Sequence, residues 1–259
     1  MFRLNNPKNP QLIYFAVEEL GQGGFGSVWG GFTNDQVPIA IKVIKPSSNP
    51  HIDFLNWWNE NNILRNCFNH RHIVAWYDSF ICNDGSLVIV MERAEGSLDS
   101  LLKLKGCFPP KLVCSIGIQL CLALNHIHYL KVIHRDLTLR NILCFPNDIV
   151  KISDFGISKQ TVPPEEFART VIGFQNAIPP ELLQFGYSTY QSDIYQLGLV
   201  LLTLLTGTEP IPLNTPIPTI YQMINDGIPR QTAESLIPQF GSLAEIISIM
   251  LRRRSDCHV

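Results

Sequence analysis

Charge is scarce in this sequence, and neither sign dominates. Lysine, arginine, aspartate and glutamate make up 16% of the 259 residues, and the formal net charge is −2. The chain therefore has no general basic field to attract a polyanion, and we expect no nucleic-acid partner. The one basic cluster, at residues 252–254, lies at the end of an expected helix, where the helix dipole favours cations.

Long apolar runs and paired cysteines are also missing. The longest apolar run, residues 197–205, is too short to cross a bilayer and predicts a buried helix, so we expect no membrane segment. The seven cysteines form no C-x-x-C pair and no cluster with histidine at zinc-ligand spacing. The first residues lack the apolar core of a signal peptide, which predicts reduced thiols and a cytoplasmic location.

Two kinds of hydrophobic pattern divide the chain, which has no internal repeat and is 46% apolar. Strands are predicted at residues 13–20, 27–32, 38–44 and 86–91, with a helix at 54–68 between them. Beyond residue 92 the pattern predicts helices at 98–104, at 112–130 and over much of 180–254. The helix at 112–130 is apolar on nearly every side and is therefore expected to be buried. The sequence thus predicts a small β-rich lobe, a hinge and a larger helical lobe with a pocket between the lobes.

A glycine-rich motif lies near the start of the small lobe. Gly21, Gly23, Gly26 and Val28 fit G-x-G-x-x-G-x-V, and glycine lets backbone amides approach phosphate oxygens. A dinucleotide-binding fingerprint has the same glycine spacing, and a glycine-rich hairpin would be a plainer explanation. The fingerprint needs a helix directly after the glycines, however, and strands follow here.

A lysine stands inside the apolar strand at residues 38–44. Burying Lys42 is costly unless phosphate oxygens or a carboxylate pair with it. Glu60 is the best candidate for the carboxylate, because it is the only acid on the inner stripe of the helix at 54–68. The alternative is a lysine at the strand edge that holds its ammonium group in water.

A catalytic segment follows in the helical lobe. The run His134-Arg135-Asp136 is followed by Asn141, and Asp154-Phe155-Gly156 begins thirteen residues after Asn141. Asp136 can orient an attacking hydroxyl or accept its proton. Asn141 and Asp154 offer hard oxygen atoms to magnesium. An isolated aspartate in a loop usually forms a turn. The catalytic interpretation therefore depends on the combination of these residues with Lys42 and the glycines.

Together these motifs resemble those of a eukaryotic-type protein kinase catalytic domain, over nearly the whole chain from Gly21 onward. The resemblance implies an α+β, bilobal kinase fold with one domain over residues 1–259. It places the N-lobe at 13–91, the hinge at 92–97 and the C-lobe at 98–259, where the family's final helix is missing. It also implies ATP and Mg²⁺ as cofactors and a protein substrate.

The resemblance implies a nucleotide site at nine matching positions. These are Gly21, Gly23, Gly26, Val28, Ala40, Lys42, Met91, Glu92 and Ala94. The glycines would cover the phosphates, the valine and the first alanine would enclose adenine, and the lysine, paired with Glu60, would hold the α- and β-phosphates. The methionine would be the gatekeeper, and the glutamate and second alanine would bond adenine through their backbone.

Catalytic roles follow from the same resemblance. Asp136 would be the catalytic aspartate, and Asn141 and Asp154 would be the metal ligands. Asp193 resembles a buried helix aspartate that braces the catalytic loop. Four residues fall where the family stacks an internal spine between the lobes: Leu64, Trp76, His134 and Phe155.

The acceptor side departs from the family. Thr138 stands where serine/threonine kinases have a lysine that contacts the transferred phosphate, and Phe174 replaces the threonine that partners that lysine. Arg140 occupies a position where tyrosine kinases have arginine. A serine/threonine protein kinase is the first interpretation. The alternatives are a kinase of tyrosine or of a non-protein hydroxyl, and a nucleotide-binding pseudokinase that works as a binding module.

Regulation and the chain's end give weaker expectations. Arg135 resembles an arginine that pairs with an activation-loop phosphate, for which Thr161 and Thr170 are candidate sites. Glu165 and Glu166 are the alternative source of negative charge. The family has an arginine that pairs with a glutamate, and Glu181 matches that glutamate. His258 stands at the position of the arginine. One of the arginines at residues 252–254 is the alternative partner for Glu181.

Overall fold

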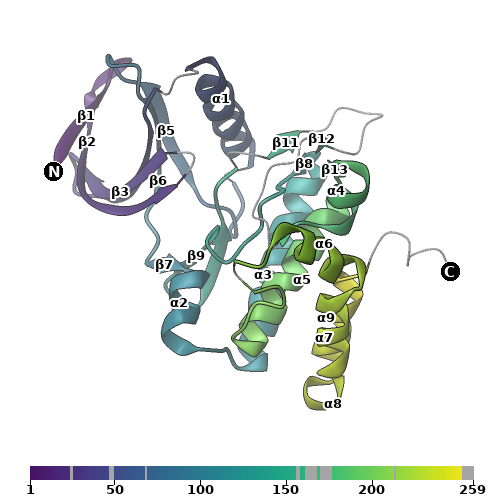
Figure 1. Cartoon of the computed structure of the whole chain (residues 1–259). Helices are drawn as coiled ribbons and strands as arrows, with labels where there is room; N and C mark the ends of the chain where they lie inside the picture. The colour runs from purple at the N-terminus through teal and green to yellow at the C-terminus, as the bar shows by residue number, and fades with distance from the viewer. Residues whose placement is uncertain are drawn as a thin grey trace.

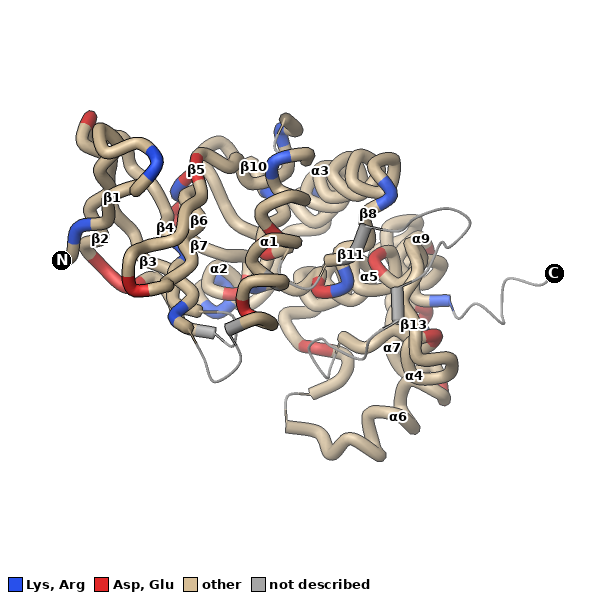
Figure 2. Tube along the Cα trace, turned by 90° about the horizontal axis from the view of Figure 1, so that it is seen from above, with Lys and Arg blue, Asp and Glu red and all other residues tan. Residues whose placement is uncertain are grey.

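The computed structural model describes residues 1–23, 26–46, 50–67, 69–155, 158–160, 168–169, 177–212 and 214–252. A curled antiparallel sheet with one helix beside it forms the N-terminal part, and helices form most of the rest (Figure 1). Basic and acidic residues are interspersed along the described chain (Figure 2). This arrangement is the bilobal fold that the sequence predicted.

Six strands form the N-terminal sheet, in the order β1-β2-β3-β4-β6-β5, and every neighbouring pair is antiparallel. Their bounds are Phe2–Asn6 (β1), Asn9–Gly23 (β2), Gly26–Thr33 (β3), Pro38–Ile44 (β4), Trp76–Ile81 (β5) and Leu87–Glu92 (β6). The four predicted strands correspond to β2, β3, β4 and β6. Along β4 the side chains alternate between the two faces of the sheet. Ala40 and Ile44 lie on the face toward α1, called the inner face, in the core shared with the helices. Ile39, Ile41 and Val43 lie on the opposite face, called the outer face, in a second core.

Helix α1 (Pro50–Cys67) packs against the inner face of this sheet. The predicted stripe of Trp57, Glu60, Leu64 and Cys67 is buried. The indole Nε1 of Trp57 donates a hydrogen bond of 3.1 Å to the carbonyl oxygen of Val88 in β6. The stripe therefore fixes the rotation of α1 about its axis, and with it the direction of the Glu60 carboxylate.

The C-terminal part is built around α5. The helices are α2 (Leu98–Lys105), α3 (Pro110–Tyr129), α4 (Pro180–Phe185), α5 (Tyr190–Thr206), α6 (Ile217–Asn225), α7 (Ile228–Ser235), α8 (Ile237–Phe240) and α9 (Ser242–Met250). Short strands connect them: β7 (Gly96–Ser97), β8 (Val132–Ile133), β9 (Ile142–Phe145), β10 (Ile149–Ile152), β11 (Lys159–Gln160), β12 (Ala168–Arg169) and β13 (Tyr187–Ser188). The apolar run at 197–205 lies in α5 and is buried throughout, as predicted.

The expectation that the helix at 112–130 is buried on all sides was wrong. Helix α3 packs on α5 and β10 with one face, while Ile118 and Leu122 on the other face are 58% and 51% exposed. Its neighbours cover only one side, so apolar composition alone overstated its burial. By length and composition α3 is the one helix among the described residues that resembles a membrane span, and its inner face packs against other elements of the protein.

The N-lobe was predicted to begin at residue 13, but the sheet already begins with strand β1, before that residue. The sequence patterns predicted neither β1 nor β5, and the two strands form opposite edges of the sheet. Side chains join these edges, because Asp78 in β5 accepts hydrogen bonds from the amide of Asn6 (2.8 Å) and the hydroxyl of Tyr14 (2.7 Å). The sheet therefore curls toward a barrel, as Figure 1 shows.

A pair of stacked histidines joins the segment after α1 to α3. The rings of His70 and His126 have centroids 4.9 Å apart and an interplanar angle of 19°. Burial lowers the pKa of His70, and the charges of the nearby His126 and His72 lower it further. The folded protein therefore binds this proton less tightly than the unfolded chain does, and stability rises with pH wherever the unfolded chain binds more protons.

We expect the stability that neutral His70 contributes to be complete above the unfolded pKa of about 6.5 and to be lost as the pH falls from there through the lowered folded pKa. Thermal melts of the wild-type protein and of His70→Asn, each at pH 7.5 and pH 5.5, measure this contribution. The variant should lose less stability on acidification than the wild type. An equal loss in both proteins would contradict the prediction.

Candidate active site

Lys42 lies at the centre of a buried charge cluster that joins the two parts of the fold. Its Nζ is 2.8 Å from both carboxylate oxygens of Glu60 and 2.9 Å from Oδ1 of Asp154. The lysine comes from β4, the glutamate from α1 and the aspartate from the segment after β10. The expected pair of Lys42 with Glu60 is present, and the third partner brings in the C-terminal part.

Charge balance keeps this lysine protonated although it is buried. Burial alone would lower the pKa of Lys42, but the Asp154 and Glu60 carboxylates raise it above the ordinary value. If one partner of the cluster were removed, the remaining charge would be buried with little water to solvate it. The loss in stability would be much larger than that from breaking an ion pair on the surface. The cluster thus holds a permanent ammonium group where the lobes meet.

The catalytic segment is a turn whose side chains are tied together. The backbone N–H of Asn141 donates to the carbonyl oxygen of Thr138 at 3.0 Å, which closes the turn. The side-chain Nδ2 of Asn141 donates to Oδ2 of Asp136 at 2.8 Å and to its backbone carbonyl oxygen at 2.9 Å. The carbonyl oxygen of Asn141 accepts the N–H of Ser153 at 2.8 Å, so the turn is held next to Asp154.

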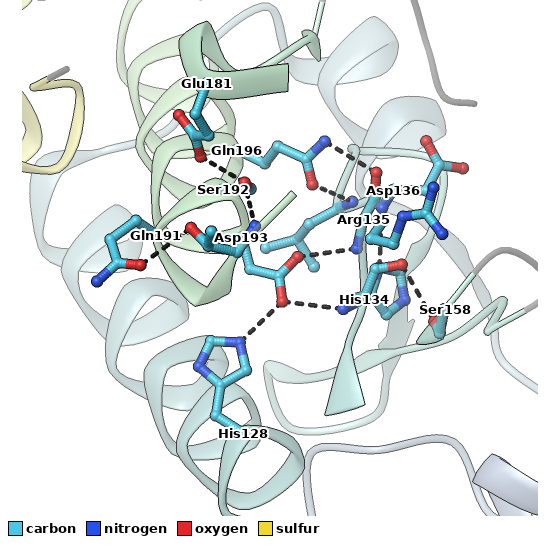
Figure 3. A network of polar contacts seen from close by, with 12 residues as sticks. His128, His134, Arg135, Asp136, Ser158, Glu181, Gln191, Ser192, Asp193 and Gln196 are labelled. Carbon is cyan, nitrogen blue, oxygen red and sulfur yellow. Dashed lines mark hydrogen bonds and ion pairs between the residues drawn. The ribbon is translucent and has the colours of Figure 1, made fainter. Parts of the chain in front are cut away.

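A buried aspartate on α5 lies beside this turn and bonds its backbone (Figure 3). Asp193 is 0% exposed, and its carboxylate accepts the backbone N–H groups of His134 (2.9 Å) and Arg135 (2.8 Å). The same carboxylate is 2.8 Å from Nε2 of His128 on α3. Because Arg135 has a positive φ of 74°, its backbone needs such outside support. Asp193 therefore connects the catalytic segment to the two central helices.

Gln196, one turn further along α5, was not predicted from the sequence. Its side-chain oxygen accepts the N–H of Leu137 at 3.0 Å, and its Nε2 donates to the carbonyl oxygens of Arg135 (3.0 Å) and Ala177 (3.1 Å). Figure 3 shows it beside Asp193, facing the same turn. The available signal was a polar residue inside an otherwise apolar helix, since a buried amide needs partners.

The predicted spine residues lie in or against the main core. Phe155 is fully buried, and the ring of His134 meets it edge to face with centroids 4.9 Å apart. Leu64 from α1 belongs to the same core, and Trp76 packs against it. Asp154 has a φ of 58°, a conformation that few non-glycine residues adopt and that often accompanies functional sites.

The predicted adenine-side residues line the inner face of the sheet and the connection after β6. Val28 packs against the main core, to which Ala40 and Met91 belong. Ala94 lies in the segment between β6 and β7. The N–H of Glu92 donates to the carbonyl oxygen of Ala75 at 3.0 Å, and its carboxylate holds Lys151 at 2.6 Å.

The predicted phosphate-covering glycines lie at the β2–β3 turn, of which residues 24 and 25 are outside the described residues. A Cβ at Gly21 would meet nothing within 4 Å, so its face of the strand is open. Gly23 pairs with Gly26 at the end of the strands. Gly26 has a φ of 115°, and a Cβ there would approach the carbonyl oxygen of Val43 to 2.4 Å, so that position requires glycine.

Thr138 lines a small cavity of about 60 Å³ between the catalytic turn and α5. Its Oγ1 is buried and has no hydrogen-bond partner among the described residues. Asp99, Arg140 and Glu209 also line this cavity. A buried hydroxyl without a partner costs about 1–3 kcal/mol relative to an apolar group of the same shape.

We expect Thr138→Val to raise the free energy of unfolding by roughly 1 kcal/mol, because it removes this unpaired hydroxyl without changing the side chain's shape. Urea unfolding measures the change, and Thr203→Val on α5, whose hydroxyl bonds the carbonyl oxygen of Leu199 at 2.8 Å, is the matched control that should lose stability. A destabilised Thr138→Val protein would contradict the prediction.

Several predicted acceptor-side and regulatory residues lie outside the described residues: Gly156, Thr161, Glu165, Glu166, Thr170, Phe174 and His258. Glu181, in the first turn of α4, is buried and accepts a hydrogen bond from the hydroxyl of Ser192. The glutamate is thus anchored to the start of α5 (Figure 3).

Comparison of the sequence with known proteins identifies one family. The family model described as "Protein kinase domain" matches residues 14–253. The chain is 34% identical over 212 residues to "Cytokinesis protein sepH" of Emericella nidulans, covering 81% of this chain and 16% of that protein. It is 33% identical over 242 residues to "Serine/threonine-protein kinases PknA" of Corynebacterium glutamicum, covering 90% and 50%.

A third relative is "Serine/threonine-protein kinase dst1" of Dictyostelium discoideum, which is 31% identical over 233 residues, 89% of this chain and 31% of that protein. The chain thus spans between 16% and 50% of the length of these three relatives.

Proposed function

Because the chain belongs to the protein kinase domain family, we propose that it transfers the γ-phosphoryl group of ATP, with Mg²⁺, to a serine or threonine hydroxyl of a protein substrate. The observation that carries the proposal is the contact of Lys42 with both Glu60 and Asp154, at 2.8 and 2.9 Å. This cluster joins the sheet, α1 and the segment after β10 at one point. Such a point is where a phosphate chain needs a fixed cation.

The nucleotide would lie between the β2–β3 turn and the catalytic turn. The open face at Gly21 leaves room for phosphate oxygens near backbone N–H groups. Val28, Ala40 and Met91 supply an apolar surface for the adenine ring. The ammonium group of Lys42 would hold the α- and β-phosphates, while Glu60 keeps it in place.

Asn141 and Asp154 fit a magnesium site by the chemistry of their donor atoms. The Nδ2 of Asn141 is used in donating to Asp136, and its Oδ1 accepts no hydrogen bond from a described residue. That amide oxygen and the Asp154 carboxylate are the hard oxygen ligands that Mg²⁺ prefers. When bound, the ion would neutralise charge on the β- and γ-phosphates.

Asp136 is proposed to orient the acceptor hydroxyl and to take its proton as the oxygen bonds to phosphorus. Asn141 fixes one carboxylate oxygen, and Asp193 and Gln196 hold the backbone that carries the aspartate. Positioning of this kind, together with electrostatic stabilisation, accounts for most catalysis in phosphoryl transfer. Residues on α5 would therefore affect the rate without contacting the substrate.

The serine/threonine assignment is supported by the names of two relatives, the serine/threonine-protein kinases of Corynebacterium glutamicum and Dictyostelium discoideum. The hydroxyl at Thr138, in place of a cation, favours the alternatives of a tyrosine or non-protein kinase and of a pseudokinase, because it removes one charge that would stabilise the transferred phosphate. We further propose a cytoplasmic location, which the free state of the six described cysteines supports.

The proposal is tested with purified protein, [γ-³²P]ATP, Mg²⁺ and a mixture of protein acceptors, followed by phosphoamino-acid analysis. We expect labelled phosphoserine or phosphothreonine, and no label when EDTA removes the metal. Phosphotyrosine alone would overturn the assignment of the acceptor. Nucleotide binding without any transfer would favour the pseudokinase.

A further inference from the structure

The outer face of the N-terminal sheet contains a cavity of about 600 Å³ that the proposed phosphoryl transfer does not use. It lies between β1, the start of β3, the end of β4 and the β5–β6 turn. Its volume is within the range of small-molecule pockets in proteins, which are mostly apolar with a few polar groups that fix the ligand's orientation.

The floor of the cavity is apolar and partly aromatic. Phe2 and Trp29 meet edge to face with ring centroids 4.9 Å apart, and the indole Nε1 of Trp29 donates to the hydroxyl of Ser27 at 2.9 Å. Leu4, Val43 and Cys82 complete the floor, and they belong to or pack against the outer core of the sheet. Because the indole nitrogen is already bonded, the floor offers a ligand aromatic and aliphatic carbon.

The rim carries two cations, Arg3 and Lys45, and one acid, Asp84. Arg3 donates from Nε to the side-chain oxygen of Asn5 at 2.9 Å. The ammonium group of Lys45 has no carboxylate oxygen of a described residue within ion-pair distance, but, after the hydrogen bonds from Ser86, it helps to lower the pKa of the Asp84 carboxyl. The one acid on the rim, Asp84, is used locally, because its carboxylate accepts the N–H of Ser86 at 2.9 Å. The cavity therefore combines an apolar floor with a surplus of positive charge at its mouth.

The cavity and the proposed nucleotide site lie on opposite faces of the same strands. In β3, Ser27 and Trp29 line the cavity, whereas Val28 between them packs against the inner core. In β4, Val43 lines the cavity, and its neighbour Lys42 makes the ion pairs of the active site. Since adjacent side chains of a strand point to opposite faces, a ligand in the cavity would be separate from ATP by the thickness of the sheet.

We propose that this cavity binds a small aromatic carboxylate, with its ring on Phe2 and Trp29 and its anionic group between Arg3 and Lys45. The ring size suits the aromatic floor, and the negative charge suits the two rim cations. The proposal does not depend on phosphoryl transfer, so it stands or fails separately from the proposed function.

The probe is 2-naphthoate, titrated into the full chain by calorimetry, with 2-naphthol as the uncharged match. We expect saturable binding at one site, and weaker binding of the naphthol. Arg3→Glu/Lys45→Glu should weaken naphthoate binding at least about tenfold, because two attractive charges become repulsive. Arg71→Glu/Lys111→Glu makes the same charge change at two exposed positions that do not line the cavity, and it should leave the affinity unchanged.

Cys82 locates the ligand independently, because its thiol lies in the cavity while Cys114 on α3 is exposed elsewhere. Alkylation at pH 8.5, followed by peptide mass spectrometry, should show naphthoate slowing modification of Cys82 but not of Cys114. Circular dichroism checks that both charge variants are folded. Absence of saturable binding to the wild type, equal affinity in the two charge variants, or no protection of Cys82 would overturn the proposal.

Discussion

Asp136→Asn is expected to lower the rate of phosphoryl transfer by roughly 10²–10⁴-fold, the range that a positioned general base contributes. The amide keeps the side chain's shape and an oxygen that can accept the Nδ2 hydrogen bond of Asn141, now at 2.8 Å from the carboxylate. It cannot take a proton from the acceptor hydroxyl. The loss should therefore appear in the catalytic rate and not in the folding of the turn.

ATP affinity is the measurement that separates this effect from general damage. Asp136 is not among the proposed phosphate-holding or metal-binding groups, so Asp136→Asn should bind ATP with Mg²⁺ within about threefold of the wild type. Lys42→Met is the contrasting variant, since it removes the cation that would hold the phosphates and leaves the carboxylates of Glu60 and Asp154 facing one another. Equal loss of ATP binding in both variants would contradict the assigned roles.

Asp193→Ala is expected to lower the free energy of unfolding by roughly 2–6 kcal/mol, since each buried donor left without a partner costs about 1–3 kcal/mol. The backbone N–H groups of His134 and Arg135 both bond this carboxylate, which is fully buried. The variant would leave both donors unpaired in the interior. Loss of Asp193 should also release the catalytic turn and reduce transfer in the protein that remains folded.

Thermal and urea unfolding measure the effect of Asp193→Ala, and Gln191→Ala is the matched control. Gln191 lies on the same helix but is exposed, and its side-chain oxygen accepts one hydrogen bond, from the hydroxyl of Thr189 at 3.0 Å, so its loss should cost at most about 1 kcal/mol. Asp193→Asn should be intermediate, because it keeps one acceptor oxygen but directs an amide group at a backbone donor. If Asp193→Ala were as stable as Gln191→Ala, the proposed support of the turn would be wrong.

The ion pair of Lys42 with Glu60 was predictable because each residue violates its local pattern. An ammonium group in an apolar strand needs a partner, and only one acid lay on the inner stripe of the helix that follows. The contact of Lys42 with Asp154 joins residues 112 positions apart. Only the resemblance to a known family indicated that those two positions share a site.

The parts of the fold that were missed depend on neighbours that the chain pattern does not contain. Strand β1 has five residues and pairs with the adjacent β2, and Asn6 ties it to Asp78, which is 72 positions away in the sequence. The exposed side of α3 has the composition of a buried one, and only the position of α5 and β10 decides which side is covered. Gln196 likewise gains its role from the turn it faces.

Transfer of ³²P from [γ-³²P]ATP to protein serine and threonine, compared between the wild type and Asp136→Asn under single-turnover conditions, tests the central claim most directly. Both proteins are first shown to be folded and to bind ATP. The account predicts labelled phosphoserine or phosphothreonine with the wild type and a rate at least about 10²-fold lower with the variant. Equal rates of labelling in the two proteins would contradict it.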